Sequence, residues 1–145
     1  MRRRWKATIL VTSCTAALIG GWVAWSVYHF FAYGIDNAYA QWGAGEMVVD
    51  YMKGHEGRWP KGWEDLRPAF EAGGGRVGGW SFEKYQSRIA IDWSADPSAL
   101  EAASARSDGP PFDVIHPADG IDAKIGSNGA NEILHRYLKA RSSRR

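Results

Sequence analysis

The residues of this 145-residue chain that are best suited to acid–base chemistry lie near the ends of two predicted strands, and they are Asp92, Asp96, Asp113 and His116. A carboxylate beside an imidazole forms a general acid–base pair. Asp96 precedes Pro97 and is better explained as a helix N-cap, and Asp92 as the outward residue of an alternating strand. No serine stands in a nucleophile-elbow context. We predict no catalytic residue, and keep a small periplasmic enzyme that uses Asp113 and His116 as an alternative.

Three other patterns match cofactor or metal motifs only in part. Residues 73–78 fit G-x-G-x-x-G, but a dinucleotide site needs a strand before the glycines and a helix after them, and here a helix precedes them. His55-Glu56 lacks the second histidine of a zinc-protease helix. Asp119 and Asp122 lack the alternating oxygen ligands of a calcium loop. The sequence predicts no cofactor and no metal.

The elements that must position these residues follow residue 36. Apolar spacing and capping signals predict helices over 40–53, 63–70, 97–104 and 129–140. Alternation predicts strands over 88–93 and 112–116, joined by a segment long enough for the crossover of a parallel pair. Residues 80–87 fit either a helix capped by Ser81 or a further strand. The predicted fold class is α+β, a small head of two or three strands covered by helices.

A run without charge precedes this head. Between Lys6 and Asp36 lie 29 residues with no formal charge, and a helix of about 20 apolar residues crosses a bilayer core of about 30 Å. The run predicts an N-terminal transmembrane helix over 7–35, a signal-anchor that continues outward as a stalk helix over 36–54. Two alternatives stay open, namely cleavage after Ala40 and a lipobox-like site that ends at Cys14.

The charge distribution predicts the orientation of the span. Residues 1–6 form a basic leader, and short basic flanks stay in the cytoplasm. We therefore expect a single-pass membrane protein with the lipid bilayer as a partner, a cytoplasmic N-terminus, an extracytoplasmic or periplasmic α+β domain over 55–140 and a basic tail over 141–145. Residues 7–131 hold 9 Lys and Arg against 15 Asp and Glu, which does not favour nucleic acid as a partner.

Two sets of residues are candidates for contacts with other proteins. Small residues at a spacing of four let two helices approach closely in a membrane, and here they are Thr12, Ala16, Gly20 and Ala24. Tryptophan and arginine are favoured at the centres of interfaces, which makes candidate partner contacts of Trp59, Trp63, Arg76 and Trp80. The only cysteine, Cys14, lies within the predicted span, so the head has no disulfide.

The segment Met47–Phe70, which reads MVVDYMKGHEGRWPKGWEDLRPAF, resembles type IV pilin-like and pseudopilin proteins. In that family a membrane helix continues outward, ends in a polar turn with glycine and proline, and leads to a short helix. The resemblance implies a stalk helix that carries a small α+β head. The prepilin-peptidase motif of the family is absent, because no glycine lies between Arg2 and the span and the first acidic residue is Asp36.

These observations predict a non-catalytic interaction or structural protein of the cell envelope, which binds a protein partner or forms a homo-oligomer. The alternatives are a pilin-like or pseudopilin subunit of a secretion or surface filament, and the small periplasmic enzyme.

Overall fold

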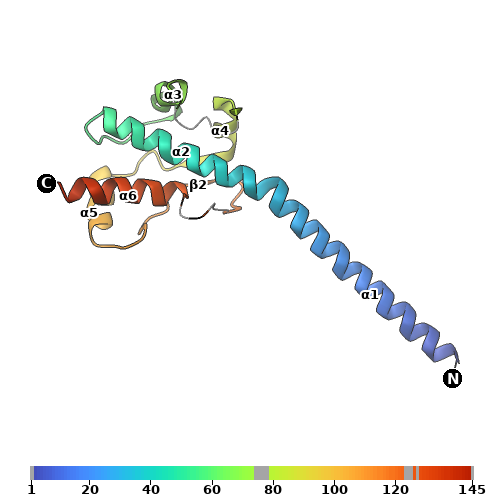
Figure 1. Ribbon diagram of the computed structural model, residues 1–145. Helices are drawn as coiled ribbons and strands as arrows, with labels where there is room; N and C mark the ends of the chain where they lie inside the picture. The colour runs from blue at the N-terminus through green and yellow to red at the C-terminus, as the bar shows by residue number, and fades with distance from the viewer. Residues whose placement is uncertain (1, 74–78, 123–125, 127, 145) are drawn as a thin grey trace. The chain divides into compact units, whose positions relative to one another are not determined.

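The chain divides into two compact units, Met1–Tyr33 and Gly34–Arg145, which are described separately. The computed structural model describes residues 2–73, 79–122, 126 and 128–144 (Figure 1), and within these it does not describe the side chains of 2–14 and 30. Arg76 therefore lies outside the described residues, and Thr12 outside the described side chains.

The first unit is a single helix, α1, which spans Arg2–His29 and passes into a π-helical turn, η1, over Phe30–Gly34. From Thr15 to Tyr28 every side chain is exposed. Aromatic rings contact one another along the chain here: the Trp25 and His29 rings are tilted, with centroids 5.1 Å apart, and the His29 and Tyr33 rings are stacked, with centroids 4.6 Å apart. The helix is held by its backbone hydrogen bonds and by such local contacts.

No helix in the described part of the chain combines the length and the apolar character needed to cross a bilayer. The predicted transmembrane signal-anchor over 7–35 therefore does not hold, and neither does the single-pass membrane location derived from it. The described residues of α1 include Gly20, Ser26 and His29, which lower the mean hydropathy of the helix. Residues 7–14 of the predicted span lie outside the described side chains.

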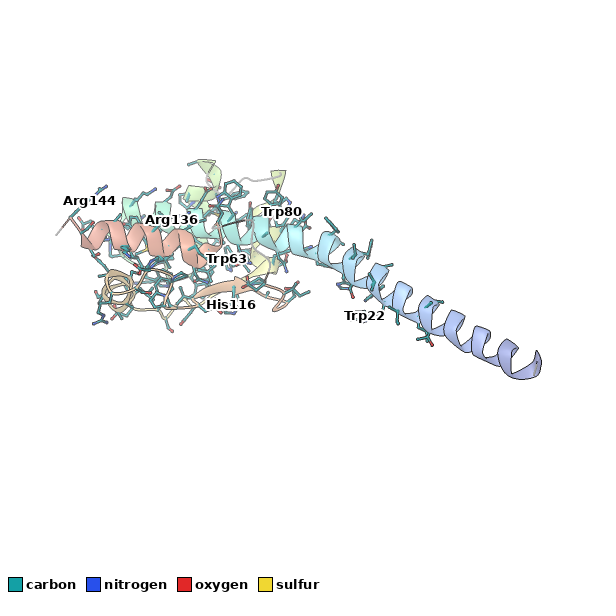
Figure 2. The ribbon with its side chains drawn as sticks, turned by 60° about the horizontal axis from the view of Figure 1, so that its bottom comes forward. Trp22, Trp63, Trp80, His116, Arg136 and Arg144 are labelled. Atoms are coloured by element: carbon teal, nitrogen blue, oxygen red, sulfur yellow. The ribbon has the colours of Figure 1, made fainter. Side chains whose placement is uncertain are left out.

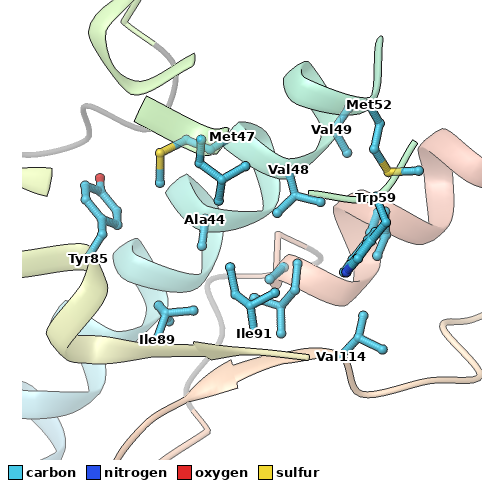
Figure 3. Close-up of a cluster of buried hydrophobic side chains, with 14 of the residues drawn as sticks. Ala44, Met47, Val48, Val49, Met52, Trp59, Tyr85, Ile89, Ile91 and Val114 are labelled. Atoms are coloured by element: carbon cyan, nitrogen blue, oxygen red, sulfur yellow. The ribbon is translucent and has the colours of Figure 1, made fainter. Parts of the chain in front are cut away.

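The second unit is built around α2, which spans Ile35–Gly54. Apolar residues recur along α2 at helical spacing, and they are fully buried: Ala40, Ala44, Met47, Val48 and Met52. Figure 3 shows this face of α2 turned toward the strands and toward Trp59. Burial of a large aliphatic side chain stabilises a fold by about 1.5–3 kcal/mol, so α2 is the centre of the core. The expected stalk is part of the globular unit.

Shorter helices surround α2. They are α3 over Trp63–Glu71, α4 over Phe82–Arg88, α5 over Pro97–Ala105 and α6 over Ala130–Ser142. Helix α6 lies alongside α2, and α5 packs on α6 (Figure 1). The Ser81 hydroxyl accepts a hydrogen bond from the backbone N–H of Lys84, and the Asp96 carboxylate accepts one from that of Ser98. These N-caps start α4 and α5, and the first one shows that residues 82–88 form a helix.

The sheet consists of two short antiparallel strands, β1 over Ile89–Ile91 and β2 over Ile115–Pro117. In their register Ile89 pairs with Pro117, Ala90 with His116 and Ile91 with Ile115. The pair is antiparallel, so the predicted parallel crossover does not form.

Side chains end both strands early. The Asp92 carboxylate accepts hydrogen bonds from the Ser94 backbone N–H and hydroxyl, which turns the chain after β1. At the start of β2, the Asn131 Oδ1 atom accepts hydrogen bonds from the backbone N–H groups of Val114 and Ile115. The predicted α+β head with two or three strands is therefore wrong, and the described fold is mostly helical with one small sheet.

The crossing of α2 and α6 depends on a glycine. A Cβ atom on Gly45 would lie 2.9 Å from the Ala130 Cα atom and 3.1 Å from its carbonyl oxygen. Real Cβ atoms do not approach backbone atoms so closely, so α6 could not begin at this point beside an alanine. Gly45, which weakens helix propensity in the sequence, permits this close contact.

Candidate interaction surface

The most distinctive surface of the described chain is the apolar side of α1. Large aliphatic and aromatic side chains there are exposed to an extent unusual for a folded protein, with 75% for Leu18, 70% for Trp22 and 62% for Trp25. Figure 2 shows the Trp22 side chain projecting away from the helix. Monomeric proteins rarely expose large contiguous apolar patches, and such patches mark interaction sites.

The exposed side chains of α1 form two different faces. At about 100° per residue, Leu18, Trp22 and Trp25 fall on one side of the helix, which we call the bulky face. Ala16, Gly20 and Ala24 fall on the opposite side, which we call the small face. No atom lies within 4 Å of a Cβ atom built on Gly20, so this face is open to a side chain from outside. Between Thr15 and Tyr33 no Asp, Glu, Lys or Arg interrupts either face.

The small residues predicted to contact another helix are thus placed on α1. Ala16, Gly20 and Ala24 are exposed and share one face. Their bulky counterpart was not singled out in the sequence, although the spacing of Leu18, Trp22 and Trp25 carries the signal.

The tryptophans predicted to contact a partner in the second unit are mainly core residues. Trp59 is 7% exposed, and its indole N–H donates a hydrogen bond to the Asp92 carbonyl oxygen at 2.9 Å. Trp63 is half-buried. Its ring makes T-shaped contacts with the rings of Phe82 and Trp93, at centroid distances of 5.8 Å and 5.6 Å. Trp59 therefore lies in the core, and Trp63 packs against it.

Trp80 occupies a different setting. Its ring is half-buried, and the Lys84 ammonium lies 3.7 Å from its centroid, which is a cation–π contact. Asp36 holds the cations beside it, at 3.6 Å from Lys84 Nζ and 3.2 Å from Arg88 Nη2. The ring is thus already covered in part by charges from its own chain.

Buried amides of α2 hold the loop after β2. The side chain of Asn37, which is fully buried, donates to both carboxylate oxygens of Asp119 at 2.9 and 3.0 Å, and accepts from Arg88 at 3.1 Å. Gln41 donates to Asp122 at 3.1 Å. Asp119 and Asp122 are therefore structural acceptors. Among the described residues no group of three or more histidine, cysteine, aspartate or glutamate side chains is arranged to hold a metal.

Asp113 and His116 line one hollow of about 290 Å³, together with Gln41, Asp122 and Asn131. Asp113 accepts a hydrogen bond from the Asn131 amide at 2.9 Å. In register with Ala90, His116 is the outward residue of β2 and is exposed (Figure 2). In catalytic triads and related sites a third group orients the general base, and within the described residues the His116 ring has no such hydrogen-bond partner.

Asp92 and Asp96, the other two candidates for acid–base chemistry, lie elsewhere, where they accept hydrogen bonds from the chain that follows them. Asp96 begins α5, and the hydroxyl and backbone N–H of Ser94 hold the pKa of Asp92 below its ordinary value. The structure therefore brings together Asp113 and His116 only.

Comparisons with known protein families, with curated proteins and with solved structures find no match to this chain.

Proposed function

We propose that this chain is a non-catalytic interaction protein that associates with further copies of itself through α1. The observation that supports this most directly is the exposure of Leu18, Trp22 and Trp25 on a helix that carries no Asp, Glu, Lys or Arg from Thr15 to its end at His29. A helix that is apolar on all sides is stable only when it is covered. The second unit of the chain already buries the apolar residues of its own helix α2, so that unit needs no partner to cover them.

A second copy is the occupant that fits α1. Bulky residues need a recess without charge, and the small face, open at Gly20, supplies one on the same helix. We expect the bulky face of one copy to pack on the small face of the next. Since the two faces lie on opposite sides of α1, the contact is heterologous, and each copy keeps one unused face for a further copy.

The test uses two variants of the full chain, each of which damages one face. Gly20→Leu fills the small face, and Trp22→Ser removes the central ring of the bulky face. We expect the native chain to form oligomers whose mass rises with concentration in analytical ultracentrifugation. Each variant alone should be monomeric, because every copy then lacks one half of the contact.

A mixture of the two variants makes the test specific. Gly20→Leu keeps a bulky face and Trp22→Ser keeps a small face, so an equimolar mixture should form a dimer that does not grow. Gly21→Leu is the matched control, because it adds the same side chain at an equally open glycine that lies off the small face. A native chain that stays monomeric, or a mixture that does not dimerise, would contradict the proposal.

The heterologous contact also bears on the filament alternative suggested by the resemblance of Met47–Phe70. An open series of such contacts grows without limit, whereas a ring closes at a fixed mass. Fibres in electron micrographs of the native chain would favour a filament subunit. A single closed mass would favour a bundle.

A further inference from the structure

Among the described side chains of α1, His29 is the one that titrates closest to neutral pH. Histidine changes its charge between about pH 5 and 8. The other titratable side chains from Thr15 to Tyr33 are Tyr28 and Tyr33, and tyrosine stays neutral in that range. A segment without any charged residue therefore carries one group that can become charged.

The helical positions place His29 within the bulky face. At about 100° per residue, it falls between Trp22 and Trp25 around the helix, on the side of Leu18. Its half-buried ring contacts the tilted Trp25 ring, with centroids 5.1 Å apart, and the stacked Tyr33 ring, with centroids 4.6 Å apart. A copy that packs on the bulky face therefore covers this imidazole as well.

Neither the bulky face nor the small face offers His29 a counter-charge. The described side chains of the first unit include no aspartate, glutamate, lysine or arginine, and the small face consists of alanine and glycine. The nearest charged residues along the chain are Lys6 and Asp36. Asp36 belongs to the second unit, where its carboxylate lies 3.6 Å from Lys84 Nζ and 3.2 Å from Arg88 Nη2.

We propose that protonation of His29 switches off self-association through α1, an inference that rests on the proposed function. A packed contact removes water from the ring, and a charge buried without a counter-charge costs free energy. In the separated chain an imidazolium keeps its water and its contacts with the Trp25 and Tyr33 rings, which attract a cation. The proton therefore binds the separated chain more readily, and a fall in pH favours separation.

Analytical ultracentrifugation of the full chain at pH 8 and pH 5.5, at one ionic strength, tests the dependence on pH. Each contact holds one bulky face, so the Kd of the contact should rise about tenfold at one pH unit below the ordinary histidine pKa of about 6.5. A native chain that is monomeric at pH 8 would contradict the proposed function itself. A chain that associates at pH 8 and equally well at pH 5.5 would overturn only the role of His29.

Two substitutions separate the charge of His29 from its ring. His29→Phe keeps an aromatic ring that takes up no proton, so its association should be the same at both pH values. His29→Arg is charged at both and should separate the copies already at pH 8, where no other histidine is protonated to a large extent. His116→Gln is the matched control, because this exposed histidine lies in the second unit and its loss should leave the pH response unchanged. A His29→Phe chain with the native pH response would count against the proposal.

The mixed dimer of Gly20→Leu and Trp22→Ser locates the effect on one face. Its single contact uses the bulky face of the Gly20→Leu chain, so only the His29 of that chain is covered. His29→Phe added to the Gly20→Leu chain should abolish the pH response of the dimer, whereas the same change in the Trp22→Ser chain should leave the tenfold response intact. Equal effects of the two placements would overturn the assignment of His29 to the contact.

Discussion

Helices α1 and α2 follow each other in the chain and meet their surroundings in opposite ways. In α2 the side chains of Met47, Val48 and Met52 are fully buried by elements of the same chain. In the described part of α1 apolar residues occur on every side, and Leu18 and Trp22 remain mostly exposed. Buried apolar side chains stabilise the domain that covers them, whereas exposed large apolar patches mark sites of interaction with other molecules.

This difference explains why the two helices contribute to different properties. The burial of α2 stabilises the second unit, because the side chains that cover it belong to the same chain. The large apolar side chains of α1 are exposed, and on our proposal they contribute when copies associate. We therefore expect changes in α2 and its neighbours to alter the stability of the second unit, and changes in α1 to alter association.

The largest effect is expected from truncating matched isoleucines in the two units. Ile115 is fully buried and Ile19 is 58% exposed. Ile115→Ala should lower the free energy of unfolding by about 2–5 kcal/mol, because it leaves a cavity. Ile19→Ala should change it by less than about 0.5 kcal/mol. Urea denaturation followed by tryptophan fluorescence measures both. Equal losses would show that α1 belongs to the same cooperative core.

Replacing a glycine by alanine should change stability by a smaller amount, and in opposite directions in the two units. Gly45→Ala places a Cβ atom against the backbone of Ala130 and should destabilise the second unit by about 1–3 kcal/mol, as overpacking does. Gly21→Ala meets no atom within 4 Å, and should raise the stability of α1 by up to about 1 kcal/mol. Circular dichroism and chemical denaturation distinguish the two results. A Gly45→Ala variant as stable as the native chain would mean that α6 can shift away from α2.

The smallest effect concerns pH. Hydrogen bonds from Arg67 lower the pKa of Glu64 on the surface of α3. Its contribution to stability is therefore present above the ordinary glutamate pKa and is lost as the pH falls through the lowered value. Surface pairs contribute little, so Glu64→Gln should reduce acid sensitivity only slightly. On α1 no aspartate or glutamate lies between Thr15 and His29, so substitutions there should leave the loss of stability at acidic pH unchanged.

Local signals in the sequence predicted most helices correctly. Ser81 and Asp96 cap helices where their side chains reach the backbone a few residues ahead, and α3 and α6 follow from apolar periodicity and turn residues. These interactions join neighbours in the chain, so they are readable without knowledge of the fold. The antiparallel pairing of β1 and β2 was not readable, because it joins segments that are far apart in the chain.

The sequence by itself determined the position of the helices and the charge-free character of the segment before Asp36. The tertiary structure decided what those features do. It shortened the strands, because Asn131 takes the backbone donors of Val114 and Ile115, and it placed α2 in the core and Gly45 at the crossing with α6. It also enclosed His135 without a hydrogen-bond partner among the residues that the structure describes. Burial and pairing between distant residues depend on how whole elements pack, and local spacing does not carry that information.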